Sequence, residues 1–289
     1  MKTNMKRKLN HELFQRYPNN PILSVEDWSY DANSVFNAAA AEINGQTLLL
    51  VRVEDFRGFS HLTVARSNDG IHNWWIDEKP TLSPDADYPE EIWGIEDARI
   101  TWVPELESWA ITYTAFSKVG PLVSLATTKD FKTFSRLGPV MTPEDKDAAI
   151  FPVRFDGRWA MLHRLVAKTG DNLTADIWIS YSPDLKHWGD HQQLIQAREG
   201  SWWDARKIGL SAPPLETYEG WLILYHGVRS TASGSIYRLG LALVDLHDPR
   251  KVIRRSVEWI FGPKAHYERE GDVDDVVFPM RMDRKRWNS

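Results

Sequence analysis

Two adjacent carboxylates and an arginine, Glu96, Asp97 and Arg99, interrupt an apolar, strand-like run that follows Gly94. Charge on such a run costs free energy unless the charges pair, face water in a cavity, or take part in chemistry. A solvated strand end with an Asp/Arg pair explains this motif equally well when it is considered alone. Residues elsewhere in the chain must distinguish this structural explanation from a functional one.

Polar residues stand at similar places near the starts of other β-rich runs, namely Asn37, Lys146 with Asp147, Lys207 and Asp272. Charged residues of the following runs can join them, namely Arg52, Arg164 and His226. Each residue alone is most simply a solvated strand end, and a lone histidine such as His163 is usually satisfied structurally. Similar residues from repeated units, however, would converge on one channel.

The chemistry of this set is a single well-placed acid, Asp97, with a surplus of cations: Lys146, Arg164, Lys207 and His226. An inverting glycoside hydrolase needs a second carboxylate to activate water. An enzyme that uses phosphate as its nucleophile needs instead a cluster of cations that holds the anion. The surplus therefore favours phosphorolysis, with inorganic phosphate as a co-substrate and no cofactor.

The elements that must position these residues recur along the chain. A strand, a polar turn with an aspartate, an aromatic residue and a second short strand occur in residues 62–74, 123–134, 177–188 and, most diverged, 239–249. The repeat period is about 55 to 60 residues. Before each copy, two β-rich runs flank a turn at Asn44-Gly45, at Pro104-Glu105, at Asp156-Gly157 or at Glu219-Gly220, which predicts hairpins.

Four strands per unit at this period are typical of propeller blades around a channel. We predict an all-β fold, a five-bladed β-propeller whose last blade is incomplete at the C-terminus. The fifth unit begins near residues 271–279, and residues 21–23 could supply its outer strand. The whole chain, residues 1–289, is then one catalytic domain with an N-terminal extension (1–17), the propeller (18–279) and an atypical tail (280–289). A sandwich or a two-domain β fold is the alternative.

Composition excludes several other classes. The 289 residues have a formal net charge of -5 without sustained basic blocks, which argues against nucleic-acid or anionic-membrane partners. Cysteine is absent, so disulfides, thiolate zinc sites and cysteine nucleophiles are impossible. The scattered histidines predict no metal site. Without an apolar span or secretory signal, a cytoplasmic location is expected. Fourteen Trp indicate repeated packing positions or sugar-stacking surfaces.

At Gly94-Ile95-Glu96-Asp97-Ala98-Arg99 the sequence resembles glycoside hydrolase family 130, the β-mannoside phosphorylases and related mannosidases. Further matching pieces are Arg52-Val53-Glu54, residues 67–70, 146–152, 207–209, 221–228, 237–240 and 271–273. The resemblance covers roughly residues 18–279. It implies a five-bladed propeller with a sugar site at the mouth of the channel.

The resemblance also implies roles for individual residues. Asp97 would be the general acid of an inverting reaction, its proton passing through a mannose hydroxyl to the glycosidic oxygen. Phosphate would be held by Lys146, Arg164, Lys207, His226 and Tyr237, and the product would be α-mannose 1-phosphate. Asn37, Arg52, Glu96 and Asp272 would bind the sugar. Arg99 is most simply a partner that orients a neighbouring carboxylate.

The expected partners are thus a β-mannoside, of the oligosaccharide or mannosyl-N-acetylglucosamine type, and phosphate. Two other functions stay open at this point. One is a β-mannosidase on the same fold that activates water with Glu54, Asp55 or another carboxylate. The other is a sugar-binding propeller without catalysis. The linkage, the acceptor sugar and the oligomeric state, including a homo-oligomer, are also left open by the sequence.

Overall fold

The computed structural model describes residues 12–169, 172–232, 234–271 and 273–282. Strands dominate this part of the chain. Helical segments in it are the 3-10 turns η1 (Val25–Asp27), η2 (Pro89–Glu91) and η3 (Pro104–Leu106) and the helix α1 (His266–Arg269). The predicted all-β class is therefore confirmed. None of the helices in the described ranges is long and apolar enough to cross a membrane.

The strands form four consecutive units of antiparallel neighbours. The first two units consist of β1 (Ser34–Ile43), β2 (Gln46–Glu54), β3 (Ser60–Ser67) and β4 (Trp75–Ile76), then β5 (Gly94–Val103), β6 (Ser108–Ser117), β7 (Gly120–Thr128) and β8 (Ser135–Pro139). A parallel pairing of Ser60 with Gly94 joins these two units into one sheet.

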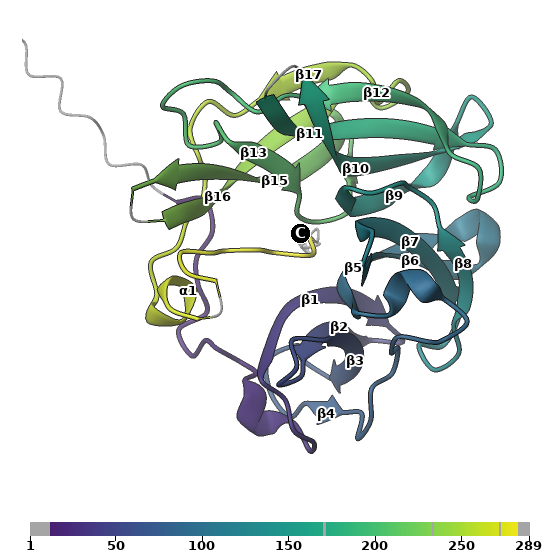
Figure 1. Ribbon diagram of the computed structural model, residues 1–289, viewed down its shortest axis with the longest axis vertical. Coiled ribbons are helices and arrows are strands. Elements are labelled where there is room, and N and C mark those ends of the chain that lie inside the picture. Colours follow the sequence, from purple (N-terminus) through teal and green to yellow (C-terminus); the bar gives the residue numbers. More distant parts are fainter. Residues whose placement is uncertain (1–11, 170–171, 233, 272, 283–289) are drawn as a thin grey trace, which may run out of the picture.

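The other two units are separate sheets. They consist of β9 (Asp145–Phe155), β10 (Arg158–Thr169), β11 (Asn172–Ser182) and β12 (Gly189–Ile195), then β13 (Lys207–Leu210), β14 (Leu215–Thr217), β15 (Gly220–Thr231), β16 (Gly234–Val244) and β17 (Val252–Arg255). Figure 1 shows the four units arranged around the middle of the molecule, with β1, β5 and β9 facing it.

Each repeat follows from the local chemistry of its turns. The predicted hairpin turns Asn44-Gly45 and Asp156-Gly157 have positive φ at both residues, the backbone that Asn, Asp and Gly tolerate best. The aspartate of the recurring phrase closes the other turn. Asp184 Oδ1, for example, accepts hydrogen bonds from two backbone N–H groups, at 3.0 and 2.8 Å. Asp69, Asp130 and Asp245 make the same pair of bonds.

Apolar clusters join consecutive units. The largest lies between the third and fourth units, where the Phe151 ring of β9 packs edge-on against Trp221 of β15 with ring centroids 5.2 Å apart. Equivalent clusters join the first unit to the second and the second to the third. Because each unit buries its faces against its neighbours, the inner strands are held at fixed distances from one another.

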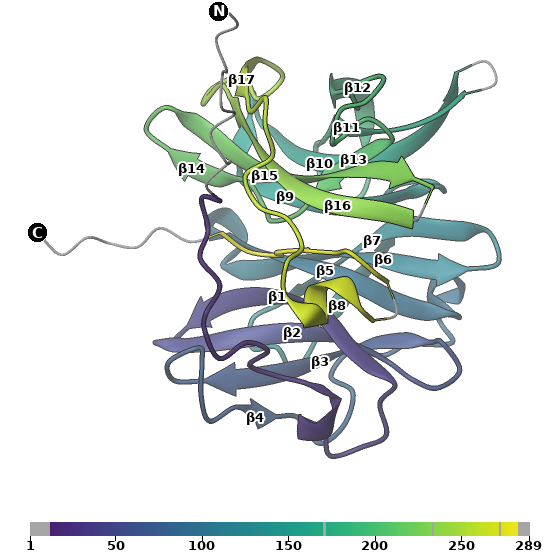
Figure 2. The same ribbon diagram turned by 90° about the vertical axis from the view of Figure 1, so that its left-hand side faces the viewer.

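The segment after β17 differs from the prediction. It contains α1 but no strand among its described residues, and neither residues 273–279 nor residues 21–23 are strands. Residues 273–282 instead cross between the fourth and first units (Figures 1 and 2). Tyr237 N of β16 donates to Asp275 O at 3.0 Å, and Val277 packs on Leu224 and Leu239. Apolar packing, rather than a strand ladder, holds this segment.

Candidate functional site

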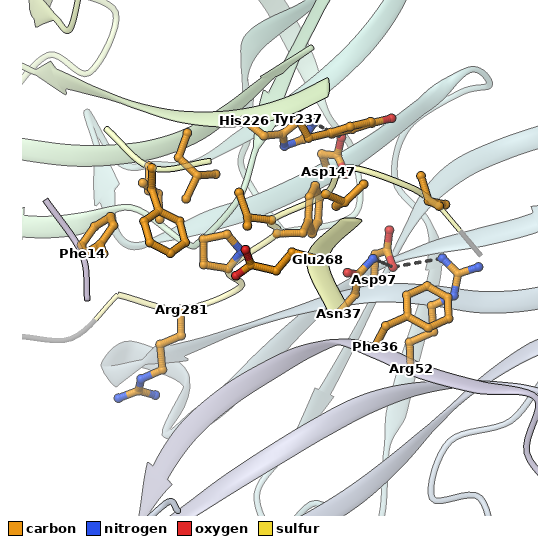
Figure 3. Close-up of a pocket in the computed structure, with 18 of the residues that line it drawn as sticks. Phe14, Phe36, Asn37, Arg52, Asp97, Asp147, His226, Tyr237, Glu268 and Arg281 are labelled. Carbon is orange, nitrogen blue, oxygen red and sulfur yellow. Dashed lines mark hydrogen bonds and ion pairs between the residues drawn. The ribbon is translucent and has the colours of Figure 1, made fainter. Parts of the chain in front are cut away.

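A cavity of about 1260 Å³ lies at the middle of the molecule, between the inner strands and the C-terminal segment (Figure 3). Its walls differ in character. One part is polar and charged, with side chains from β1, β2, β5, β9, β10, β13 and β15. The other part is built by the fourth unit and by residues near both ends of the described chain. It combines apolar side chains such as Phe14, Leu239 and Val277 with the charged side chains of Arg16 and Glu268. The polar part contains the predicted site residues.

Three inner strands aim a side chain into the cavity by the same backbone device. Asn37 of β1, Asp97 of β5 and Asp147 of β9 have φ values of 47°, 48° and 53°. At each of them the pairing with the next strand shifts register, as in a β-bulge. Asn and Asp are the residues, apart from glycine, that adopt this left-handed backbone most readily. The bulge explains why polar residues interrupt otherwise apolar strands.

Asp97 lies at the cavity surface with two polar neighbours. Its Oδ1 accepts hydrogen bonds from Asn37 Nδ2 at 2.9 Å and from Arg52 Nη1 at 3.1 Å (Figure 3). Burial alone would raise the pKa of Asp97, but the charges of Arg52, Arg99 and Lys146 outweigh burial and lower the pKa. Without substrate the carboxyl group is therefore ionised.

Arg52 connects three carboxylates at this side of the cavity. Besides Asp97 it contacts Glu54 Oε2 at 3.2 Å and Glu96 Oε1 at 3.3 Å, and its guanidinium lies over the Phe36 ring. Glu96 also lies 3.8 Å from Lys146 Nζ. Burial raises the pKa of Glu96 more than these cations lower it. Glu96 thus stands behind the arginine and the lysine that line the cavity.

Asp147 is the most strongly compensated carboxylate of the site. Arg99 Nη2 donates to its Oδ1 at 3.1 Å, and Arg164 Nη1 lies 2.9 Å from its Oδ2. Burial would raise the pKa of Asp147, but Arg164 and Arg99 dominate and hold it well below the ordinary range. Arg99 itself is 1% exposed and also donates to the carbonyl oxygens of Asp97 and Leu210. The predicted role of Arg99 as a partner of a neighbouring carboxylate agrees with these bonds.

His226 and Arg164 carry polar atoms that lack partners within the described residues. Both ring nitrogens of His226 and Nε of Arg164 are buried without a hydrogen bond. The nearest carboxylate oxygen to His226 Nε2 is Asp147 Oδ2 at 3.6 Å, too far for a hydrogen bond. Burial lowers the pKa of His226 to about 3, helped by Arg164, Arg99 and Lys207, although Asp147 opposes the shift. The imidazole is therefore neutral at the cavity wall.

Lys207 and Tyr237 complete the polar wall. Lys207 Nζ lies 5.3 Å from the centre of the Tyr237 ring, and the same ring packs against His226 with centroids 5.9 Å apart. No ion pair involves Lys207 in the described ranges. Gly209, two residues later, is required by space, because a Cβ there would lie 2.5 Å from Asp147 Oδ2 and 2.6 Å from His226.

The structure thus brings together nearly all predicted site residues. Those that line the cavity are Asn37, Arg52, Asp97, Lys146, Arg164, Lys207, His226 and Tyr237. Glu96 contacts two of them, and Asp272 lies outside the described residues. Asp147, which the sequence analysis placed beside Lys146 without giving it a role, also lines the cavity. It follows Lys146 at the place where Asp97 follows Glu96.

The described chain contains no group of three His, Asp or Glu side chains suited to a metal ion. The polar wall offers instead amine, guanidinium and imidazole nitrogens beside one carboxylate whose partners are an amide and an arginine. Donors of this kind bind an oxyanion such as phosphate. A carboxylate next to an anion site and a polar pocket is suited to acid catalysis of group transfer.

Comparison with known proteins agrees with this chemistry. The family profile described as β-1,4-mannooligosaccharide phosphorylase, of glycoside hydrolase family 130, matches residues 6–286. The chain is 36% identical to a β-1,2-mannobiose phosphorylase of Listeria innocua, over 91% of this chain and 87% of that protein. It is 32% identical to a β-1,4-mannooligosaccharide phosphorylase of Ruminococcus albus, over 93% and 80%.

The fold is similar as well. The solved structure of β-1,2-mannobiose phosphorylase from Listeria innocua in complex with β-1,2-mannobiose superposes with a TM-score of 0.81 at 34% identity, covering 91% of this chain and 88% of that one. The family profile and the relatives that are more than 30% identical over most of the chain point to the same family. The chain belongs to glycoside hydrolase family 130 and is an enzyme of the glycoside phosphorylase type.

Proposed function

We propose that the protein cleaves β-mannosides by inverting phosphorolysis and releases α-mannose 1-phosphate. The observation that carries the proposal is the set of buried, unpartnered nitrogens of Arg164 and His226, two residues that line the same cavity as Asp97. Buried donors without a partner cost free energy unless a ligand satisfies them. A phosphate bound by Lys146, Arg164, Lys207, His226 and Tyr237 would accept hydrogen bonds from Nε of Arg164 and from the one N–H of the neutral His226 ring.

In the proposed reaction a phosphate oxygen attacks the anomeric carbon from the face opposite the leaving oxygen. The bond between that carbon and the glycosidic oxygen breaks, and the configuration inverts. The leaving oxygen takes up a proton that originates on Asp97 and passes through a mannose hydroxyl. Asn37 and Arg52, which hold Asp97 in the free site, would also contact the mannose ring, together with Asp272. Glu96 would act on the sugar through Arg52 and Lys146, which it contacts.

Phosphate binding would prepare Asp97 for this role. In the free site the cations lower the pKa of Asp97, which favours the ionised form and is unsuited to an acid. A phosphate dianion next to Lys146 and Arg164 opposes those charges, so it raises the pKa of Asp97. Protonation of the acid would thus be favoured when the nucleophile is in place.

We also infer that the substrate is a β-linked manno-oligosaccharide and that the chain forms a five-unit ring around the cavity. The similar relatives are named for β-1,2 and for β-1,4 linkages, and both remain candidates here. The ring is supported by the four repeated units, with residues 264–282 in the fifth position (Figure 1).

A hydrolase is less well supported by the geometry. Water activation requires a carboxylate that is free to accept a proton. Glu54 pairs with Arg52, Asp147 pairs with Arg99 and Arg164, and Asp55 pairs with Arg57 at 2.7 Å. These pairings stabilise the charged carboxylates and make them poorer bases.

The test is to incubate the protein with β-1,2- and β-1,4-mannobiose with and without inorganic phosphate. We expect cleavage only with phosphate, and we expect Lys207→Ala to raise the KM for phosphate at least about tenfold. Free mannose released at the full rate without phosphate, with this phosphate-independent rate unchanged in Lys207→Ala, would support the hydrolase. Mannoside binding without turnover in any condition would support a binding protein.

A further inference from the structure

A chain of buried polar side chains crosses the third unit behind the cavity wall. Asp145 Oδ2 of β9 lies 2.6 Å from His163 Nδ1 of β10, and His163 Nε2 lies 2.7 Å from Ser180 Oγ of β11. Ser180 Oγ in turn lies 2.6 Å from Nδ1 of His191 on β12. The chain therefore runs from the innermost strand of the unit to its outermost strand.

This arrangement has the connectivity of a catalytic triad, but it cannot act as one. The side chains of Asp145, His163 and Ser180 are each at most 1% exposed, and none of the three lines the cavity. A nucleophilic serine must reach a carbonyl carbon and have an oxyanion site beside it. The Ser180 hydroxyl instead lies between two imidazoles. Any function of this series of hydrogen-bonded side chains must therefore be exerted through the residues next to them on β9 and β10.

Those residues are the cations of the cavity. Asp145 directly precedes Lys146 on β9, and His163 directly precedes Arg164 on β10. Lys146 and Arg164 are themselves paired across the two strands. Because successive residues of a strand point to opposite faces, the buried pair and the cavity pair lie back to back. Contacts that fix Asp145 and His163 therefore also fix the backbone that carries Lys146 and Arg164.

The backbone at this place needs such support. The pairing of β9 with β10 shifts register between Leu162 and Arg164, and Asp147 has a left-handed backbone with φ 53°. A bulge disrupts the ladder of backbone hydrogen bonds, so side-chain contacts must fix the local register. The contact between Asp145 and His163 spans the two strands at this position.

We propose that the Asp145–His163 pair, braced by Ser180, is a positioning device that holds Lys146 and Arg164 in the geometry that binds phosphate. The inference rests on the proposed function, since it concerns the same anion site. Asp145 and His163 are positioning residues, because they do not touch the cavity. Loss of the pair should weaken phosphate binding selectively and leave mannoside recognition, which depends on the first and second units, nearly intact.

The test is Asp145→Asn, which removes the charge and preserves the shape of the side chain. We expect the KM for phosphate to rise about tenfold, in the range found when groups that orient ligand-binding residues are removed, while the KM for mannoside changes less than about twofold. Ser180→Ala leaves the pair in place and removes only its brace. It should raise the KM for phosphate in the same direction by a smaller factor, and it decides the question if Asp145→Asn does not fold.

Glu91→Gln is the matched control. Glu91 is another fully buried carboxylate, held by Tyr113 at 2.6 Å and by Arg136 at 3.2 Å, and it does not line the cavity. It should lower the melting temperature without a selective rise in the KM for phosphate. A second readout, the rise in melting temperature that phosphate produces, reports binding without turnover.

The outcomes separate the two proposals. Phosphate affinity that is unchanged in Asp145→Asn and Ser180→Ala, or weakened equally in Glu91→Gln, overturns the positioning role. If the wild-type protein itself neither binds nor requires phosphate, the proposed function fails instead.

Discussion

Asp97 of the second unit and Asp147 of the third occupy the same place in their repeats, yet they are prepared for opposite tasks. Both follow a charged residue at the start of an inner strand, and both have a left-handed backbone. Asp97 has an amide and one arginine as side-chain partners and lies at the cavity surface. Asp147 has two arginines and faces a buried histidine.

One side chain creates much of this difference. Arg99 donates from Nη1 to the backbone carbonyl of Asp97 and from Nη2 to the carboxylate of Asp147. It therefore supports the position of the first residue while it neutralises the charge of the second. The repeat therefore sets where an aspartate points, whereas the cations around the aspartate set what it can do. In the proposed function, Asp97 remains available for chemistry and Asp147 organises the anion site.

The largest expected effect is on catalysis by Asp97. Asp97→Asn should lower kcat by about 10²–10⁴-fold, the usual contribution of a general acid, because the amide cannot supply the proton. Phosphate binding and the melting temperature should change little, since the amide can still accept from Asn37. Steady-state kinetics on β-mannobiose, together with thermal denaturation, checks both parts. An unchanged kcat would remove Asp97 from the mechanism.

The next largest effect is expected at Asp147, where a substitution should lower the stability of the protein. Asp147→Asn leaves Arg99 and Arg164 without their buried anion, and breaking such a buried pair costs about 3–5 kcal/mol in the free energy of unfolding. Denaturant unfolding measures this cost. Added phosphate should recover part of it, since phosphate supplies the missing negative charge. Equal stability losses in the Asp97 and Asp147 variants would contradict the division of tasks between the two carboxylates.

A smaller effect concerns His226, which faces Asp147. The pKa of His226 is lowered to about 3 from an ordinary value of 6.5, so the unfolded chain binds a proton that the folded protein excludes between these pH values. Stability contributed by this group is thus lost as the pH falls below 6.5, by about 1 kcal/mol between pH 6.5 and pH 5.5. Unfolding at several pH values should show a weaker slope for His226→Gln. An identical slope would mean that His226 binds its proton equally well in the folded and the unfolded protein, so that its pKa is not lowered.

Much of the fold could be predicted because its signals are local. Turn sequences such as Asn44-Gly45 and the recurring aspartate of Asp184 act within a few residues, and they marked the units correctly. The segment after β17 lacks such signals. Its conformation depends on distant contacts such as that of Val277 with Leu224, so the expectation of a strand there was wrong.

The site was predictable to the extent that repetition places similar residues at similar positions. That argument collected Asn37, Asp97 and Lys146 before any geometry was available. It could not separate Asp97 from Asp147, because their difference arises from Arg99 and Arg164, which come from other strands. Nor could it reveal the buried pair of Asp145 and His163, since each residue alone looks like an ordinary strand residue.

The central claim is that phosphate, and not water, attacks the anomeric carbon of the mannosyl unit in the cavity that Asp97 and the cations line. The most direct measurement is an NMR time course of β-mannobiose cleavage in the presence of inorganic phosphate, with detection of the first product. We expect α-mannose 1-phosphate from the earliest time points, in amounts equal to the bonds cleaved. Free mannose as the first product of the cleaved mannosyl unit, with no sugar phosphate formed, would contradict it.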